Sequence, residues 1–245
     1  MNFKEGDYVL VFIDGRKYLK KLSKDFHLSY RGKILRFEDV INKSYGTYID
    51  GFLLLKPTIE EIILYGFERG TQILYPKDSF YCAFKLGLSE DKSLLEFGTG
   101  VGAATAVFYQ LCKNITTIEL RKEFHLKALK NWERFGLCKE IRSLNCDFLE
   151  AQIKDSEFDC AFVDVKNPID YLEKLKICLK PGAKVGWVLP TANQVSLLLS
   201  RLKGFDAVEV LEILHRSYKP NPDRLRPEDT MVAHTGYLVF AIKSM

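Results

Sequence analysis

The spacing of apolar and polar positions divides the chain into two parts with different rhythms. In the first part, short β-branched and aromatic runs are separated by turn signals. The first run is Tyr8–Ile13, and Asp14-Gly15 follows it as a hairpin turn. Further strands are expected at residues 16–22, 33–37 and 46–55. The pattern predicts a small β-rich domain over residues 1–56, and Thr58 is expected to cap the helix that follows it.

The second part, residues 57–245, alternates strands with helices. Short apolar runs predict buried strands at 93–97, 115–118, 141–144, 160–163 and 184–189. Amphipathic stretches predict helices at 103–112, 122–135, 168–179 and 194–202. Such alternation predicts an α/β fold with a doubly wound, mostly parallel sheet. The tail, residues 234–242, reads as a final strand that pairs antiparallel with residues 209–213.

Composition adds a few limits to this picture. The 245 residues are 47% hydrophobic and 28% charged, which is an ordinary globular balance. A net charge of +4 is compatible with a nucleic-acid partner but does not argue for one. The six cysteines include no C-x-x-C pair, so we expect reduced, buried thiols in a cytoplasmic protein and no metal site. The longest apolar stretch, 185–199, is too short and too polar to cross a membrane, and no targeting segment precedes the first strand.

A glycine-rich loop follows the first strand of the second part. Gly98, Gly100 and Gly102 let the backbone turn tightly and approach a ligand, and the N–H groups from Val101 to Ala103 can hold an anionic group. Gly98, Gly100 and Ala103 also satisfy the dinucleotide fingerprint G-x-G-x-x-[GA]. The loop alone therefore leaves a nucleotide site, another cofactor site or a plain tight turn open.

Four acidic residues stand at the ends of four successive strands. Glu96 precedes the glycines, and Glu119 ends the second strand, where an acid can accept both ribose hydroxyls. Asp147 and Asp164 follow the third and fourth strands, and Asp147 is placed to accept from an adenine amine. Together they suit a cofactor with an ammonium group, a ribose and an adenine, as in S-adenosylmethionine. They would repel the pyrophosphate of NAD, so the methyltransferase interpretation is favoured over an oxidoreductase.

Three further blocks are more specific. Residues 69–78 contain Q-x-x-Y-x-K-D, and they resemble the corresponding block of tRNA (adenine-58-N-1)-methyltransferases of the TrmI type. Residues 189–195 and 232–239 look like two more blocks of that family. The resemblance covers nearly the whole chain, including the small N-terminal β domain. Two positions depart from it: Val101 stands where the family usually has serine, and Pro168-Ile169 replaces a frequent Pro-Trp.

The resemblance implies S-adenosylmethionine as methyl donor, an adenine of the tRNA T-loop as acceptor, and a homotetramer. By motif position, Asp164 sits beside the methyl group and the target base, and Tyr75 lines the base pocket. Glu96 is expected to face the amino-acid moiety. The other expected cofactor-binding residues are Leu74, Gly98, Gly100, Val101, Gly102, Ala103, Glu119, Asp147 and Phe148.

The chemistry needs no general base, because the acceptor ring nitrogen carries a lone pair and no proton. We expect Asp164 to accept a hydrogen bond from the exocyclic amine and to stabilise the charge that develops on the ring. Tyr75 is expected to stack on the extruded base. His234 lies in an apolar strand pattern, and we favour a structural role for it.

Other interpretations remain open. A methyltransferase for a protein or small molecule would share the fold, and an RNA-binding subunit without a cofactor site would keep the specific blocks. The retained glycine loop and strand-end acids argue against the latter. Two groups of basic residues either meet RNA phosphates or form solvated faces: Lys17, Lys20 and Lys21, and Arg216, Lys219, Arg224 and Arg226.

Overall fold

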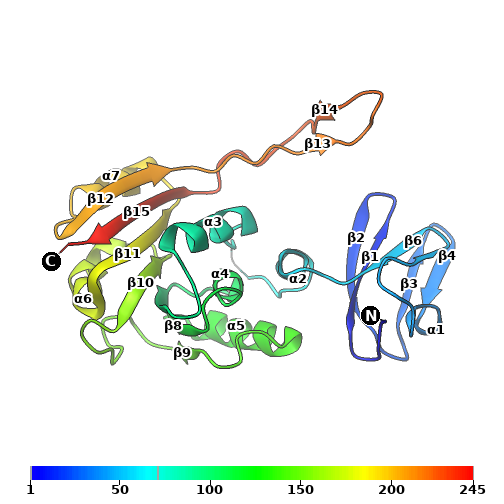
Figure 1. The fold of residues 1–245 in the computed structure, drawn as a ribbon, viewed down its shortest axis with the longest axis horizontal. Helices are drawn as coiled ribbons and strands as arrows, with labels where there is room; N and C mark the ends of the chain where they lie inside the picture. The colour runs from blue at the N-terminus through cyan, green and yellow to red at the C-terminus, as the bar shows by residue number, and fades with distance from the viewer. Residues whose placement is uncertain (1, 71, 245) are drawn as a thin grey trace. The chain divides into compact units, whose positions relative to one another are not determined.

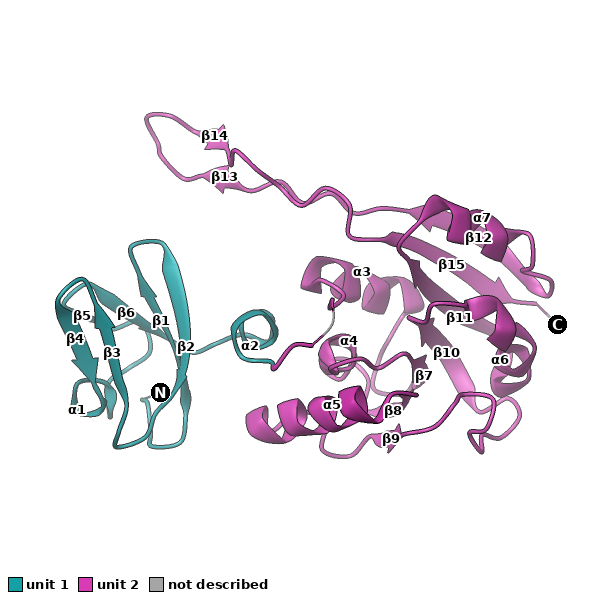
Figure 2. Cartoon of the chain, turned by 180° about the vertical axis from the view of Figure 1, so that it is seen from behind, with its two compact units in different colours: residues 1–67 teal, residues 68–245 magenta. Residues whose placement is uncertain are grey.

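The computed structural model describes residues 2–70 and 72–244, so Thr71 of the motif block at 69–78 lies outside the described residues. The chain divides into two compact units, Met1–Phe67 and Glu68–Met245 (Figure 2). The sequence pattern placed the boundary after residue 56. The two boundaries differ by the helix α2 (Ile59–Tyr65), which belongs to the N-terminal unit. A salt bridge of 2.8 Å between Lys17 and Glu61 connects α2 to the N-terminal sheet.

The N-terminal unit is a β domain with its own core. Four antiparallel strands form a sheet in the order β2-β1-β6-β5, and β3 pairs with β4 as a separate hairpin. Their bounds are β1 (Tyr8–Ile13), β2 (Arg16–Lys21), β3 (His27–Tyr30), β4 (Lys33–Arg36), β5 (Tyr48–Ile49) and β6 (Phe52–Leu55), with α1 at Phe37–Val40. The predicted strand at 33–37 is one residue too long because Phe37 begins α1, and β3 was not predicted. The predicted cap is confirmed, since the Thr58 side chain accepts from the Glu61 N–H.

The second unit is built on a seven-stranded sheet in the order β12-β15-β11-β10-β7-β8-β9 (Figure 1). The strands are β7 (Ser93–Phe97), β8 (Asn114–Ile118), β9 (Arg142–Leu144), β10 (Phe158–Val163), β11 (Leu179–Leu189), β12 (Phe205–Leu211) and β15 (Tyr237–Lys243). All neighbours from β9 to β11 pair parallel, and β15 runs antiparallel between β11 and β12. The predicted doubly wound sheet with an antiparallel last strand is confirmed.

Helices cover both faces of this sheet. In both views α3 (Pro76–Leu86), α4 (Ala103–Phe108) and α5 (Lys122–Phe135) lie on one side, and α6 (Leu172–Cys178) and α7 (Ala192–Leu199) lie on the other (Figures 1 and 2). The core on the α6 and α7 side is continuous from β8 to β15 and contains Phe97, Trp187 and Val239. Burial on both faces explains the continuous apolar runs of the central strands.

Several predicted boundaries were wrong for local reasons. The helix from Ala103 ends at Phe108 rather than at 112, and the stretch 168–179 divides into a 3₁₀ turn (Pro168–Tyr171) and α6, while Leu179 already begins β11. The last strand starts at Tyr237 rather than at 234. Helix α3 was not predicted, although Pro76 at its first turn and the left-handed Gly87 at its end are ordinary start and stop signals.

A long arm leaves the sheet between β12 and β15. Residues 212–236 run outward as two extended segments and turn back at a short β13 (Tyr218–Lys219) and β14 (Arg226–Pro227) pair (Figure 1). The arm carries the second predicted basic group. Lys219 and Arg226 both form ion pairs with Asp229, so part of this charge is balanced within the arm.

All six cysteines are free thiols, and five of them are buried as expected. Cys146 is the half-buried one. Among residues 2–70 and 72–244, no helix is long and apolar enough to cross a membrane.

Gly102 allows α4 and α5 to meet closely. It caps α4 in the left-handed conformation, with φ at +82°, and its carbonyl accepts from the Trp132 indole N–H at 2.9 Å. A Cβ atom at this position would lie 2.4 Å from the Trp132 nitrogen. No side chain fits there without moving the tryptophan.

We therefore expect Gly102→Ala to lower the free energy of unfolding by roughly 3 kcal/mol or more, through backbone strain and overpacking. The thermal unfolding midpoint should fall accordingly. The matched control is Gly182→Ala. Gly182 has a similar φ of +79° but open space around a built Cβ, so it should cost only about 1–2 kcal/mol. Equal losses in the two variants would contradict the packing role of Gly102.

Candidate cofactor and acceptor site

The strand register brings the predicted site residues to one edge of the sheet. Val163, Phe97, Ile118 and Leu144 are aligned across four neighbouring strands. The residues that follow them are Asp164, Gly98, Glu119 and Asn145. Since β7 lies between β8 and β10, this edge is also the point where the winding of the sheet changes direction, which is where α/β folds bind ligands.

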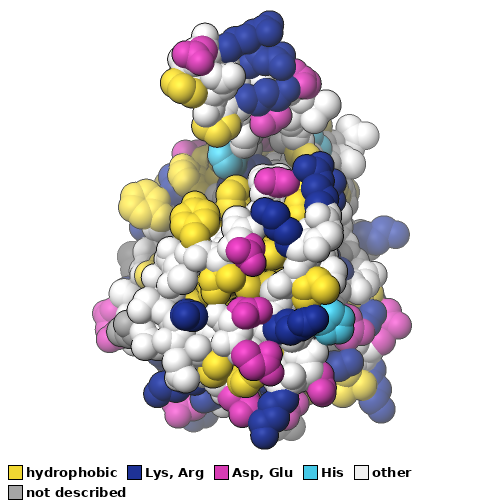
Figure 3. All heavy atoms as spheres, turned by 90° about the vertical axis from the view of Figure 1, so that its right-hand side faces the viewer, with side chains coloured by type: hydrophobic (Ala, Val, Ile, Leu, Met, Phe, Trp, Pro, Cys, Tyr) yellow, Lys and Arg dark blue, Asp and Glu magenta, His cyan; other side chains and the backbone are white. Residues whose placement is uncertain are grey.

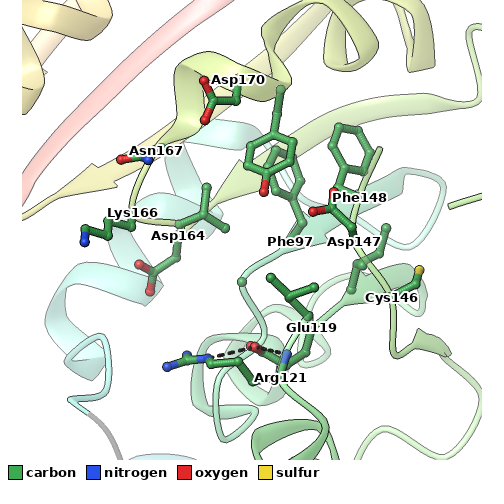
Figure 4. A pocket seen from close by; sticks show the side chains of 15 residues that line it. Phe97, Glu119, Arg121, Cys146, Asp147, Phe148, Asp164, Lys166, Asn167 and Asp170 are labelled. Carbon is green, nitrogen blue, oxygen red and sulfur yellow. Dashed lines mark hydrogen bonds and ion pairs between the residues drawn. The ribbon is translucent and has the colours of Figure 1, made fainter. Parts of the chain in front are cut away.

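A cavity of about 400 Å³ opens at this edge (Figure 4). Predicted residues contribute much of its wall: Gly98, Glu119, Asp147, Phe148 and Asp164. The remaining lining residues were not predicted, and they are Phe97, Ile118, Leu120, Arg121, Cys146, Val165, Lys166, Asn167, Asp170 and Tyr171. The volume is in the range of small-molecule sites.

Glu119 is held rigidly at the wall of this cavity. Its side chain is 3% exposed, and its Oε2 accepts from the Gly100 N–H at 2.8 Å. Its Oε1 accepts from the backbone N–H of Arg121 at 2.9 Å and from the guanidinium Nε at 3.2 Å. A carboxylate offers about four lone-pair positions, so one position remains for a ligand hydroxyl beside these three donors.

Asp147 and Phe148 form a second part of the wall. Asp147 Oδ1 accepts from the Leu149 N–H at 2.8 Å, which fixes the carboxylate at the end of β9. The Phe148 ring stacks on Phe97 with centroids 4.3 Å apart, and Tyr171 packs edge-on against Phe97. An acceptor of hydrogen bonds next to an aromatic wall suits a flat heterocycle with an exocyclic amine.

Asp164 lies where β10 meets the glycine loop. Its backbone N–H donates to the Phe97 carbonyl at 3.0 Å, and its side chain reaches the cavity. The Asp164 side chain is accessible from the cavity. Partial loss of water around its carboxyl raises the pKa of Asp164 to about 7, the Glu119 carboxylate acts in the same direction, and Arg121 opposes both. A Cβ atom on Gly98 would lie 1.9 Å from the Asp164 carbonyl oxygen. Glycine at 98 is thus a requirement of this close approach.

A second, smaller cavity of about 30 Å³ adjoins the first. The predicted Leu74, Gly100, Val101 and Ala103 line it, together with Gln72, Ile73, Thr99 and Ala104. Gly98 and Asp164 line both cavities. Asp164 is therefore the carboxylate placed between the glycine loop and the larger cavity.

Glu96 stands behind the site and lines neither cavity. It is 1% exposed, and its Oε2 accepts from the hydroxyls of Thr105 at 2.6 Å and Thr117 at 2.7 Å. Burial raises the pKa of Glu96 to about 7 against the lowering effect of these two hydrogen bonds. The sequence-based expectation that Glu96 faces the ligand directly therefore stays a prediction, and the contacts observed here tie β7, β8 and α4 together.

Tyr75 stands at the start of α3 and is half-buried. Its backbone carbonyl accepts from the N–H groups of Asp78 and Ser79 at 2.9 and 3.0 Å. It is not among the residues that line the two cavities, and its stacking role stays a prediction. The following residues of the block form a buried cluster: Lys77 Nζ donates to Asp78 Oδ1 and to the Thr235 hydroxyl, each at 2.7 Å.

This cluster joins the three family-specific blocks. Thr235 donates to Asp78 at 2.8 Å, so the block at 232–239 is bound to the block at 69–78. His234 contacts the Glu212 carboxylate at 2.6 Å through Nδ1 and the Pro190 carbonyl at 2.9 Å through Nε2, which adds the block at 189–195. With an acceptor at each ring nitrogen, the doubly protonated ring satisfies both contacts. The hydrogen bond to Glu212 accordingly raises the pKa of His234. These contacts support the structural role that we favoured for His234.

The cavity suits an organic cation better than a pyrophosphate. Four carboxylates line it, from Glu119, Asp147, Asp164 and Asp170, against the two cations Arg121 and Lys166. A ligand with a net positive charge, a ribose and an adenine matches this set of hydrogen-bond acceptors. An anion would be repelled by the excess of carboxylates. Within the described ranges, no group of three or more His, Cys, Asp or Glu residues is placed to hold a metal ion.

Arg121 and Cys146 are two of the ten lining residues that the sequence argument missed. Both lie close to a predicted acid in the sequence. Arg121 is two residues after Glu119, and Cys146 directly precedes Asp147. The parallel register makes the residues after a strand end part of the same edge. That rule was a signal that could have found both.

A doubly wound sheet with a glycine loop and strand-end carboxylates around one cavity is the Rossmann-like fold of S-adenosylmethionine-dependent methyltransferases. Within this class, the family model of the tRNA methyltransferase complex GCD14 subunit matches residues 51–225, and the chain belongs to this family.

Known proteins resemble the chain along most of its length. The crystal structure of tRNA (m1A58) methyltransferase TrmI from Aquifex aeolicus is 50% identical, covers 100% of both chains and superposes with a TM-score of 0.96. A structure described as an S-adenosylmethionine-dependent O-methyltransferase from Thermotoga maritima is 34% identical over 100% of this chain and 95% of its own, with a TM-score of 0.91. The TrmI of Methanocaldococcus jannaschii, a tRNA (adenine(57)-N(1)/adenine(58)-N(1))-methyltransferase, is 27% identical over 78% of each chain.

The buried Glu96 predicts a pH-dependent stability. Its pKa rises from 4.5 in the unfolded chain to about 7 when folded, so the folded state binds its proton more tightly. This contribution to stability is present below about pH 4.5 and is lost as the pH rises towards about 7. Glu96→Gln should therefore unfold at nearly the wild-type temperature at about pH 5 and at a higher temperature than wild type at about pH 8.

Thermal unfolding of the full chain at the two pH values measures this. Glu133→Gln, at an exposed position of α5, is the matched control and should follow wild type at both. If the unfolding temperatures of Glu96→Gln and wild type differed by the same amount at both pH values, the raised pKa of the buried Glu96 would be contradicted.

Proposed function

We propose that this chain transfers a methyl group from S-adenosylmethionine to ring nitrogen 1 of an adenine in the tRNA T-loop, at position 58 or also at its neighbour. The observation that carries the proposal is the retained site: the glycine loop and the carboxylates Glu119, Asp147 and Asp164 share one cavity edge. Family membership and the 50% identity to the Aquifex aeolicus enzyme support tRNA adenine as acceptor. A tRNA substrate also supports a cytoplasmic location.

In this proposal each carboxylate has a separate task. Glu119 accepts from a ribose hydroxyl and Asp147 accepts from the adenine amine of the cofactor, with Phe148 beside the ring. The loop from Gly98 to Ala103 and Leu74, which line the smaller cavity, border the amino-acid end. Asp164, which borders both cavities, faces the reacting centre. S-adenosylmethionine supplies, when bound, an electrophilic methyl group on a sulfonium.

Asp164 then acts by position and charge. Its carboxylate accepts from the exocyclic amine of the target adenine, which orients the ring nitrogen for in-line attack. As positive charge develops on the base, the same carboxylate stabilises it. Tyr75, at the start of α3, stacks on the extruded base, an interaction worth about 1–3 kcal/mol. The buried Lys77–Asp78–Thr235 cluster supports Tyr75 in this role by fixing the first turn of α3.

The partners follow from the same proposal. The exposed basic residues of β2 and the arm are candidates for phosphate contacts, and Figure 3 shows Lys and Arg side chains gathered at the protruding end of the arm with acidic ones among them. The arm and its base also expose several large apolar side chains, namely Leu214, Tyr218, Leu225, Met231 and Val232. Such a surface marks a protein interface, and we propose that it is buried in a homotetramer.

Light scattering on the purified chain should give four times the monomer mass. A monomer at micromolar concentration would contradict this assembly.

The reaction is tested by incubating the protein with labelled S-adenosylmethionine and an unmodified tRNA transcript. The RNA is then digested without alkali, because alkali can move the methyl group to the exocyclic amine. The expected product is 1-methyladenosine. Cofactor binding without any RNA product, and transfer to a small hydroxylated acceptor instead, would favour the alternative of a small-molecule or protein methyltransferase, which the Thermotoga maritima neighbour's description motivates.

The same assay tests Asp164. Asp164→Ala should lower kcat by about 10²–10³-fold while the Kd for S-adenosylmethionine, measured by calorimetry, changes by less than about tenfold. Asp155→Ala removes an exposed carboxylate outside both cavities and serves as the control. Full turnover in Asp164→Ala would show that the carboxylate does not assist the transfer.

A further inference from the structure

Arg121 is one of three charged residues of the cavity without a task in the proposed function, the others being Lys166 and Asp170. We propose that Arg121 is a positioning residue of the cofactor site, which orients the ribose-binding Glu119 and supplies the positive charge that keeps Asp164 ionised. The inference rests on the proposed function, because it assumes that S-adenosylmethionine occupies the cavity.

The geometry fixes Arg121 on two sides. Its guanidinium lies over the Phe124 ring, with Cζ 4.0 Å from the centroid, and its Nε is 3.2 Å from Glu119 Oε1. Stacking on an aromatic face suits the planar guanidinium and limits its rotation. Its backbone N–H donates to the same Glu119 oxygen at 2.9 Å. Arg121 therefore fixes one oxygen of the carboxylate while the Gly100 N–H holds the other, although more than half of the arginine side chain remains exposed.

The same guanidinium extends towards the side of the cavity that holds Asp164 (Figure 4). The groups that interact electrostatically with Asp164 come from four elements: Glu96 on β7, Glu119 after β8, Cys82 on α3 and Arg121 at the start of α5. Among these described groups Arg121 is the only cation, and it opposes the rise of the Asp164 pKa. Lys166 is the other cation that lines the cavity, two residues after Asp164.

With four carboxylates and one fewer cation, the carboxylates of the cavity would keep their protons up to a higher pH. Asp164 faces the reacting centre, so its ionisation matters most for a ligand with a positive sulfur. S-adenosylmethionine carries that sulfonium, whereas the product S-adenosylhomocysteine has a neutral thioether in the same skeleton. The ratio of the two affinities therefore reports the charge of the carboxylates near sulfur and cancels effects on the shared ribose and adenine.

Proton linkage gives the direction in which the affinity ratio changes with pH. Above the pKa of Asp164 in the free protein, the carboxylate is charged and the affinity for S-adenosylmethionine is full. Below it, binding must displace a proton, and the preference for S-adenosylmethionine over S-adenosylhomocysteine falls. Without Arg121 this fall begins at higher pH, by roughly half a unit to one unit for a cation that is partly exposed.

The experiment measures Kd values of both ligands by calorimetry, from about pH 5.5 to about pH 8, for wild type and Arg121→Met. The midpoint of the affinity ratio should move upward in Arg121→Met, so that the ratio at about pH 6.5 is lower by roughly three- to fivefold. Lys122→Met is the matched control, since it removes the neighbouring positive charge from a residue that does not line the cavity. It should leave the midpoint where wild type has it.

Arg121→Lys separates charge from orientation. Lysine keeps the positive charge but lacks the planar fork, so we expect a ratio midpoint near wild type with weaker binding of both ligands. Equal losses for the two ligands in Arg121→Met with an unmoved midpoint, or a shift of the same size in Lys122→Met, would overturn the role of Arg121. Failure of the wild-type chain to bind S-adenosylmethionine would instead overturn the proposed function, and this inference with it.

Discussion

The site depends on one close approach of backbone to backbone. At the edge of the sheet, the Gly98 α-carbon lies so near the Asp164 carbonyl that no side chain fits between them. Three backbone hydrogen bonds continue this contact along the edge: Asp164 to Phe97, Gly98 to Ile118 and Glu119 to Leu144. The carboxylates after β8 and β10 are thereby held at the same level as the glycine loop. Everything that the cavity offers a ligand follows from this alignment.

A second set of contacts joins the base of the arm to α3. The three family-specific blocks are far apart in sequence, yet Lys77, Asp78 and Thr235 are joined by hydrogen bonds. The adjacent His234 bonds to the Pro190 carbonyl. Lys77 also donates to the Ile213 carbonyl at 2.8 Å, so both strands at the base of the arm are fixed to α3. Buried charged groups persist only when they are fully paired, and this explains why the residue types in the blocks are so specific. The network couples the arm to the helix that begins at Tyr75.

The sequence predicted the parts of this structure that depend on local pattern. Apolar runs, glycine spacing and strand-end acids located the sheet, the loop and most of the cavity wall. Features that depend on three-dimensional neighbours were missed. Glu96 is one example: it lies within β7, and its contacts with Thr105 and Thr117 could not be read from the sequence.

Helix α3 and the start of β15 were missed for a related reason. Residues of α3 were interpreted as a motif, although Cys82 and Leu86 form an ordinary buried face. The strand β15 begins late because His234 and Thr235 bond to side chains and to the Pro190 carbonyl instead of to a neighbouring strand. The N-terminal unit likewise extends past the predicted boundary because Lys17 reaches Glu61. Side-chain contacts of this kind leave little trace in hydrophobic periodicity.

The central claim is that the converging carboxylates recognise a cationic, adenosine-containing cofactor rather than a dinucleotide. Calorimetric titration of the purified chain with S-adenosylmethionine and, separately, with NAD tests it most directly. The account predicts saturable binding of S-adenosylmethionine in the micromolar range, roughly −8 kcal/mol, and no measurable heat with NAD. Saturable binding of NAD together with no binding of S-adenosylmethionine would contradict it.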